Sequence, residues 1–161
     1  MDELLVLARG LPRRVVDAGE VVLADGAATD ALYVLLEGTL RVEKGGVAIA
    51  TVAEPGTCVG EMSLLLDVPV TADVVAVERS VLAVIDDAPA RLDAGPELPL
   101  ALARLLAARL QVMTSYLADL KHQYADHEGG LGMVDVVLDS LTRAGGQRSQ
   151  LASERDPEPE Y

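Results

Sequence analysis

The sequence predicts an antiparallel β-sandwich or barrel followed by a long C-terminal helix. From residue 13 to residue 86, short apolar runs rich in valine alternate with turns that contain Gly or Asp. This texture is typical of antiparallel all-β folds. From Pro96 onward the apolar residues recur with the period of a helix. The strand-and-turn pattern and the helical period together predict a mainly β fold with a helical C-terminal part.

The composition indicates one domain with an appendage and an aliphatic core. The chain has 161 residues, of which 50% are hydrophobic but only 2% are aromatic, and it contains no Phe or Trp. A chain of this length suits a single domain. Its core must therefore be built mainly from Ala, Val and Leu.

The elements can be assigned in order along the chain. Residues 2–9 are expected to form a short helix, which Gly10 and Pro12 end. Lys44-Gly45-Gly46 predicts a β-hairpin between the two strands that flank it. The runs expected to contain the strands are RRVV, GEVVLADG, DALYVLLEG, TLRVEKGG, VAIATV, EPGTCVGE, TADVVAVE and SVLAVID.

A seam of apolar residues runs along the long helix, which is predicted over about residues 97–125. Its members alternate in spacings of three and four, which is the heptad pattern of coiled coils; they are Ala103, Leu106, Leu110, Met113, Leu117, Leu120 and Tyr124. Leu102 and Leu105 widen the apolar stripe near the start. We therefore expect the first half to pack on the sandwich and the second half to form a dimer seam. The alternative is an ordinary helix packed within its own domain.

Four segments are predicted from these patterns. Residues 1–95 form the β-roll with its short N-terminal helix, and residues 96–128 form the long dimerisation helix. Residues 129–146 form a second, short helix, whose apolar residues Leu131, Val134, Leu138 and Leu141 have helical spacing. Residues 147–161 form a polar, acidic tail that is expected to be disordered.

The charge balance excludes several classes of partner. The formal net charge is −13, from 26 acidic and 13 basic residues, and no basic cluster occurs. Direct contact with nucleic acid or an anionic membrane is therefore not expected, because phosphate recognition relies on clustered Lys and Arg. No apolar run suits a transmembrane span, and the acidic N-terminus does not suit a signal peptide. A cytoplasmic location is the default expectation.

The reactive residue types do not indicate an enzyme or a metal site. Cys58 is the single cysteine, so it cannot form an internal disulfide, and we expect it to be a small buried strand residue. His122 and His127 both follow the predicted strands, and their spacing does not suggest a metal site. No Ser–His or Cys–His arrangement can be assigned. We predict a non-enzymatic protein without a metal ion.

The order of these parts resembles the cyclic nucleotide-binding domain family, in particular the effector domain of cyclic AMP receptor proteins without its helix-turn-helix domain. GEVVLADGAATDALYVLLEGTLRVE is similar to the opening strands of that family, and GTCVGEMSLLLDVPVTADVVA is similar to its phosphate-binding cassette. The resemblance covers about residues 10–125. It implies a double-stranded β-helix, or jelly roll, followed by a long C-terminal dimerisation helix.

The resemblance also implies a ligand site. Gly60 and Glu61 would meet the ribose, with the carboxylate accepting a hydrogen bond from the 2′-hydroxyl. The short helix that begins at Met62 would direct backbone N–H groups at a cyclic phosphate, since a helix N-terminus carries unpaired donors and partial positive charge. Ser63 would lie in the same pocket. The implied ligand is cyclic AMP or another cyclic nucleotide.

Two residues of the long helix are implied to close this pocket. The stretch RLQVMTSYLADL is similar to the family segment that reaches the adenine, which makes Thr114 and Ser115 the candidates. The alternative is that both are surface residues on the flank of the helix.

The sequence departs from the family pattern where a phosphate-binding Arg is expected. Val70 occupies that place and Thr71 follows it. No cationic residue lies between Lys44 and Arg79, whereas this stretch contains Glu54, Glu61, Asp67, Asp73 and Glu78. Losing a buried charge-assisted partner typically costs about 2–5 kcal/mol. Either a cyclic nucleotide or related ligand binds weakly, or the site binds no physiological ligand.

A second departure follows the long helix. GMVDVVLDSLTRAGG resembles the opening helix of a winged helix-turn-helix domain, but no basic recognition helix follows it. This helix either has that origin or packs back on the dimer, and in both cases it needs an apolar surface on the other subunit or another protein. We predict a homodimeric regulatory module that senses a small ligand weakly and signals through its dimer helix to a protein partner. The alternative is a degenerate domain that binds no nucleotide and acts as a structural or protein-interaction dimer.

Overall fold

The computed structural model describes residues 2–123 and 131–143. The chain divides into two compact units, residues 1–107 and 108–161. Tyr124, His127 and the predicted tail over residues 147–161 lie outside the described residues. No helix in the described ranges is both long and apolar enough to cross a lipid bilayer.

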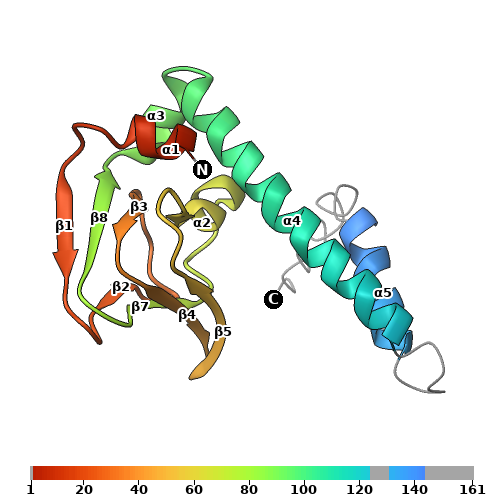
Figure 1. The fold of residues 1–161 in the computed structure, drawn as a ribbon. Coiled ribbons are helices and arrows are strands. Elements are labelled where there is room, and N and C mark those ends of the chain that lie inside the picture. Colours follow the sequence, from red (N-terminus) through yellow and green to blue (C-terminus); the bar gives the residue numbers. More distant parts are fainter. Residues whose placement is uncertain (1, 124–130, 144–161) are drawn as a thin grey trace, which may run out of the picture. The chain divides into compact units, whose positions relative to one another are not determined.

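The first unit contains a roll of two four-stranded sheets (Figure 1). All strand pairs are antiparallel. The first sheet has the order β1-β8-β3-β6, and its strands are β1 (Arg13–Val16), β8 (Ser80–Ile85), β3 (Leu32–Glu37) and β6 (Cys58–Val59). The second has the order β2-β7-β4-β5, and its strands are β2 (Val21–Leu23), β7 (Asp73–Ala76), β4 (Leu40–Lys44) and β5 (Val47–Val52). The predicted jelly roll is confirmed.

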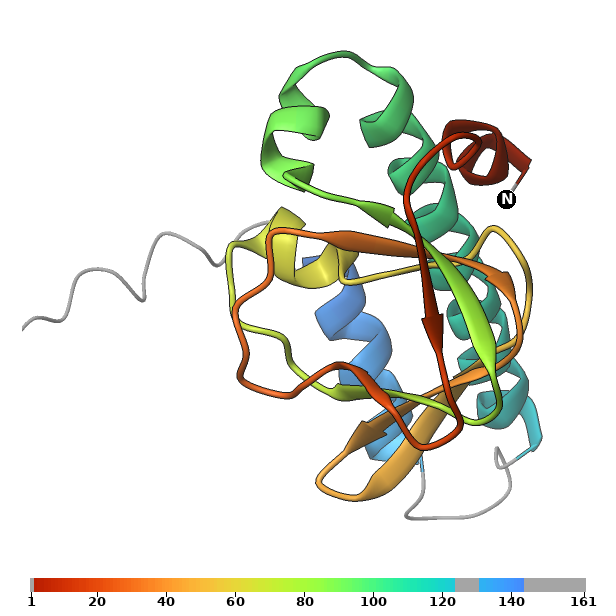
Figure 2. The ribbon, with the colours of Figure 1, turned by 90° about the vertical axis from the view of Figure 1, so that its left-hand side faces the viewer.

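Helices cover one end of this roll. Helix α1 (Asp2–Leu7), α3 (Ala88–Asp93) and the start of α4 (Glu97–Gln123) gather there (Figure 1). Helix α2 (Glu61–Leu66) lies beside the strands, as Figure 2 shows in yellow. The sequence patterns did not predict α3, although Pro89 in its first turn is a helix-start signal.

Strands β3, β6 and β8 of the first sheet are buried on both faces, which explains why they are almost continuously apolar. Leu32 and Val34 of β3 enter a helix-side core under α1 and α4, whereas Leu35 enters a roll core between the two sheets. In β6 the same alternation sends Cys58 to the helix-side core and Val59 to the roll core. Successive side chains of a strand point to opposite faces, so each strand serves both cores.

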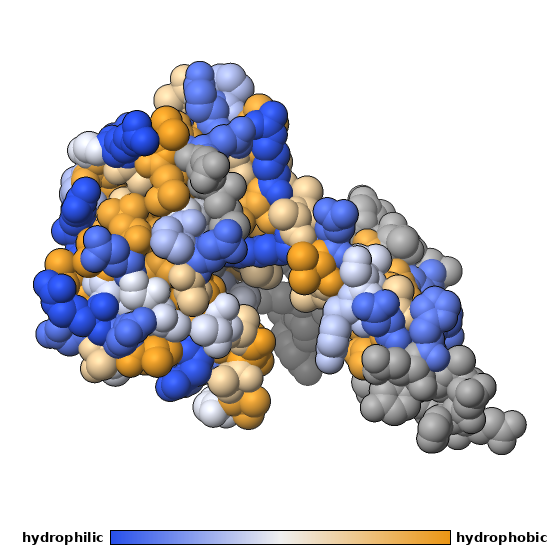
Figure 3. All heavy atoms as spheres, viewed as in Figure 1, coloured by the Kyte–Doolittle hydropathy of each residue, from blue (hydrophilic) through white to orange (hydrophobic). Residues whose placement is uncertain are grey.

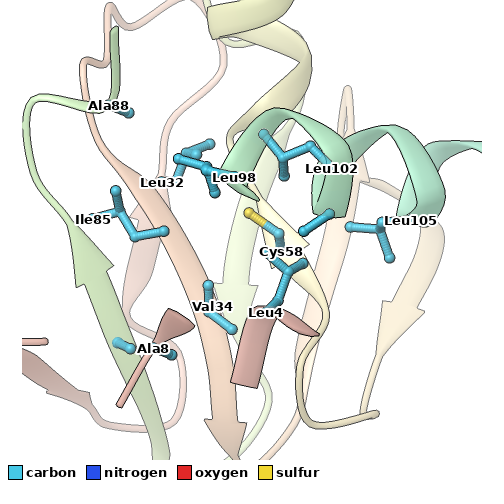
Figure 4. Packing of buried hydrophobic residues seen from close by; sticks show 12 residues of the cluster. Leu4, Ala8, Leu32, Val34, Cys58, Ile85, Ala88, Leu98, Leu102 and Leu105 are labelled. Atoms are coloured by element: carbon cyan, nitrogen blue, oxygen red, sulfur yellow. The ribbon is translucent and has the colours of Figure 1, made fainter. Parts of the chain in front are cut away.

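The first half of α4 packs on the roll, as predicted. Leu98, Leu102 and Leu105 are buried in the helix-side core together with Leu4 of α1 and Cys58, and Figure 4 shows these side chains converging. Burying one such leucine stabilises a fold by about 1.5–3 kcal/mol. This packing fixes the start of α4 against the first sheet.

The predicted hairpin at Lys44-Gly45-Gly46 joins β4 to β5. Both of its glycines have positive φ. Strand β5 is an edge strand, and its Val47 and Ile49 are 65% and 60% exposed. A β-bulge interrupts its pairing with β4 opposite the junction of Val42 and Glu43. On the face of the molecule shown in Figure 3, hydrophobic residues are interspersed with hydrophilic ones.

The second unit contains the rest of α4 and helix α5 (Leu131–Arg143). Lys121 of α4 forms an ion pair with Asp135 of α5. Three apolar side chains of α5 at the predicted helical spacing are half-buried; they are Val134, Leu138 and Leu141. Leu110 and Met113, which belong to the predicted seam, are 48% and 54% exposed.

The turn between β3 and β4 requires a glycine. Gly38 has a φ of 95°, and a Cβ atom there would lie 2.2 Å from the Oγ of Ser80 and 2.7 Å from its Cα. Ser80 is fully buried, and its hydroxyl accepts a hydrogen bond from the Thr39 N–H at 3.1 Å and donates one to the Glu78 carbonyl at 2.9 Å. This hydroxyl therefore ties the turn to the start of β8.

We expect Gly38→Ala to destabilise the roll strongly, because the methyl group would strain the backbone and displace Ser80. The left-handed conformation costs about 1–2 kcal/mol and overpacking adds about 1–3 kcal/mol. Urea denaturation followed by circular dichroism measures the free energy of unfolding. Gly26→Ala is the matched control, because Gly26 has a φ of 81° but open space around it. Equal losses in the two variants would contradict the role of Ser80.

Candidate functional site

A tight turn carries the chain from β6 into α2. Gly60 has a φ of 96°, and a Cβ atom there would lie 3.1 Å from the Ala31 carbonyl oxygen and 3.4 Å from Cδ1 of Leu23. Only glycine adopts this conformation readily and leaves room for these neighbours. The turn therefore places Glu61 at the first position of α2, next to the segment that precedes β3.

The side chains of α2 divide between the interior and the surface. Glu61 is only 3% exposed and Ser63 is also buried, whereas Met62 is half exposed. The helix ends at Leu66 and is capped by Asp67, whose φ is 54° and whose N–H donates to the Ser63 carbonyl. The sequence-predicted residues of the ribose side are therefore held together on one short helix, with a buried carboxylate at its start.

Val70 occupies a core position. Its side chain is 5% exposed and belongs to the roll core together with Leu23 and Val59. Its N–H donates to the Ala27 carbonyl at 2.8 Å, and its carbonyl accepts from the Gly26 N–H at 2.7 Å. Thr71, which follows it, is exposed. At the position where the resemblance implies a phosphate-binding Arg, this chain has an isopropyl group that packs in its own core.

The remaining two candidates lie in the second unit. Thr114 and Ser115 are exposed on α4, and the Thr114 hydroxyl donates to the Leu110 carbonyl at 2.8 Å. Such a bond to the preceding turn is common for threonine in helices. Their contact with a ligand remains a prediction.

The two basic residues that most closely precede the cassette (residues 56–76), Arg41 and Lys44, have acidic partners. Lys44 lies 2.8 Å and 3.0 Å from the two carboxylate oxygens of Asp25, and Arg41 pairs with Glu43. The N–H of Asp25 donates to the carboxylate of Asp73 at 2.8 Å, which joins this cluster to the end of the cassette. Lys44 and Arg41 thus neutralise local carboxylates. In the described ranges, no group of His, Cys, Asp and Glu side chains is arranged to hold a metal ion.

The backbone neighbours of Gly60 and Val70 were missed in the sequence. Gly26 and Ala27 bond to Val70, and the Ala31 carbonyl packs on Gly60. All three belong to the stretch ADGAATDA between β2 and β3. Only Gly26 in that stretch indicated a turn. The contacts of backbone carbonyls with a distant segment do not depend on side-chain type, so the sequence does not reveal them.

Comparison with known proteins identifies the roll. Residues 13–90 match the cyclic nucleotide-binding domain family, which confirms the resemblance seen in the opening strands and the cassette. Among solved structures, the catabolite activator protein of Thermus thermophilus is 25% identical with a TM-score of 0.58, and the match covers 89% of this chain and 84% of that one. No curated protein matches the chain.

Two further structures have the same fold. The N-terminal domain of a transcriptional regulator from Streptomyces coelicolor A3(2) is 27% identical with a TM-score of 0.51, over 70% of this chain and 84% of that one. A cyclic nucleotide-binding domain from Methylobacillus flagellatus KT is 21% identical with a TM-score of 0.60, over 73% and 82%. The chain spans 32% and 33% of the length of two matched regulatory subunits of cAMP-independent protein kinase A, from Trypanosoma cruzi and Trypanosoma brucei, and 36% of cAMP-bound PfPKA-R.

We expect Val70→Ala to destabilise the roll by about 1–3 kcal/mol, because it removes two buried methyl groups and leaves a small cavity. Thr71→Ala is the control, and its exposed side chain should contribute within about 0.5 kcal/mol. Chemical denaturation of both variants checks the difference. If Val70→Ala cost no more than Thr71→Ala, the side chain of Val70 would not be part of the core.

Proposed function

Because residues 13–90 match the cyclic nucleotide-binding domain family, we propose that the chain is a non-enzymatic regulatory module with an altered cassette. It binds cyclic AMP or a related small ligand weakly. It forms a homodimer through the second half of α4 and passes its signal to a protein partner in the cytoplasm.

The observation that carries this proposal is the contrast between the two ends of the cassette. Gly60 and the buried Glu61 keep the turn and the carboxylate that would meet a ribose. Val70 replaces the cation that would meet a phosphate. Loss of such a partner costs about 2–5 kcal/mol, which corresponds to roughly 30-fold to several thousand-fold in affinity. Recognition of the sugar without a counter-charge for the phosphate supports weak binding.

Helix α4 offers a route from the roll to a partner. It is one continuous helix over Glu97–Gln123, with residues in both units. Leu98, Leu102 and Leu105 face the helix-side core, whereas the seam residues Leu110 and Met113 are exposed within one chain. A ligand that favoured one packing of α4 over another would shift the population presented to a partner. The exposed seam supports a second copy as the first partner.

A second candidate is a degenerate domain that binds no nucleotide and serves as a structural or protein-interaction dimer. The packing of Val70 favours it, because this side chain fills part of the roll interior with Leu23 and Val59. The two candidates share the dimer and differ in the ligand. Calorimetry separates them.

We expect cyclic AMP or cyclic GMP to bind with a Kd below about 1 mM and Glu61→Gln to weaken this binding at least about tenfold, because the amide oxygen is a weaker acceptor than the carboxylate. Isothermal titration calorimetry on the full chain measures both. Glu78→Gln is the control, since Glu78 is exposed in the turn between β7 and β8. Absence of heat with either nucleotide would remove the sensing proposal and leave the degenerate domain.

A Val70→Arg variant tests the counter-charge directly. If the ribose side of the site is intact, the guanidinium should strengthen cyclic nucleotide binding by about 30-fold or more, which is the lower end of the loss assigned to its absence. Calorimetry with cyclic AMP is again the measurement, after circular dichroism has shown that the variant is folded. A folded variant with unchanged affinity would argue against Val70 as the cause of weak binding.

We expect Met113→Glu to convert the dimer to a monomer, because the seam would then bury like charges from two subunits. Sedimentation velocity gives the oligomeric state. Val112→Glu is the matched control, since Val112 is 71% exposed but does not belong to the seam. A dimer that survives Met113→Glu, or that Val112→Glu breaks equally, would place the interface elsewhere.

A further inference from the structure

A cavity of about 190 Å³ lies in the helical end of the first unit, apart from the cassette. Helices α1 and α3, strand β8 and the start of α4 all contribute to it. It is lined by Leu7, Leu11, Ile85, Arg91, Ala94, Gly95, Glu97 and Leu98. Pockets for drug-sized ligands have volumes of about 300–1,000 Å³, so this cavity suits a smaller molecule.

The floor of the cavity is aliphatic. Ile85 and Leu98 are buried members of the helix-side core, and Leu7 and Leu11 pack against that core while remaining partly exposed. No aromatic residue lines it. A branched aliphatic group would cover these exposed methyl groups and gain the usual free energy of apolar burial.

The walls of the cavity carry two opposite charges that do not pair with each other. Arg91 and Glu97 both line it and both are exposed. Among the described residues neither side chain takes part in an ion pair. The carboxylate of Glu97 lies close to the backbone of Gly95, where a Cβ atom would be 2.5 Å from its Oε2. A donor for a carboxylate and an acceptor for an ammonium group are therefore both present beside one apolar floor.

We propose that this cavity binds a free aliphatic α-amino acid of the size of leucine. Its carboxylate pairs with the guanidinium of Arg91, its ammonium group pairs with Glu97, and its side chain lies on Ile85 and Leu98. A zwitterion can pair with both charges at once, whereas a fatty acid or an alkylamine can pair with only one of them. All the lining residues belong to the first unit, and none belongs to the cassette, so this site is independent of the function proposed above.

The test is a titration of the ¹⁵N-labelled full chain with L-leucine, followed by nuclear magnetic resonance. We expect the backbone amide signals of Ala94, Gly95 and Leu98 to shift with a Kd of about 1 mM, as suits a small ligand with few contacts. The amide signals of Gly60 and Glu61 should not move. No shift at millimolar leucine, or shifts confined to the cassette, would overturn the proposal.

Analogues and variants test the two charges separately. 4-Methylpentanoate, which lacks the ammonium group, and 3-methylbutylamine, which lacks the carboxylate, should each bind about two- to fivefold more weakly than leucine, because an exposed ion pair contributes little. Glycine, which lacks the side chain, should bind at least about tenfold more weakly. Arg91→Gln and Glu97→Gln should each weaken leucine binding about two- to fivefold for the same reason as the two analogues, with Arg79→Gln as the control. Equal binding of 4-methylpentanoate and leucine, or unchanged leucine affinity in both variants, would overturn the proposal.

Discussion

The burial of strands β3, β6 and β8 on both faces is the constraint from which the rest of the first unit follows. Every second side chain of β3, β6 and β8 must fit the helix-side core, and those between must fit the roll core. A slip of one residue would exchange the two sets, so the register is strongly specified. Cys58 and Val59 point into opposite cores. This register places Gly60 at the turn after β6 and Glu61 at the first position of α2.

Val70, in the segment between α2 and β7, is also held in the roll core. Burying a valine stabilises a fold by about 1.5–3 kcal/mol relative to leaving it exposed. A guanidinium at this position would need a buried partner, because an uncompensated charge in a core is strongly destabilising. The valine therefore stabilises the roll without a ligand and lowers the gain that an anionic ligand could provide. If the proposed site is correct, stability of the roll and binding of a phosphate would place opposite demands on this one position.

Much of the fold could be predicted from the sequence because its signals are local. Valine-rich runs gave the strands, Lys44-Gly45-Gly46 gave the hairpin, and Cys58 is buried as expected. Helix α3 was missed because its sequence, APARLD, contains a single large apolar residue and so shows no apolar stripe. The hydrogen bonds of Val70 to Gly26 and Ala27 join backbone groups that are far apart in the chain. No pattern of side-chain types could have predicted them. The apolar seam on α4 could be predicted from its spacing, but an apolar pattern does not identify the surface that contacts it.

The bulge in β5 has a consequence for behaviour at high concentration. This strand, VAIATV, contains no charge and no proline, and an unprotected edge of that kind is a template for indefinite strand addition. The extra residue at Ile49 breaks the ladder and turns the edge away from a flat arrangement. Resistance to aggregation thus depends on the bulge in β5 as well as on electrostatic repulsion between copies of this acidic protein.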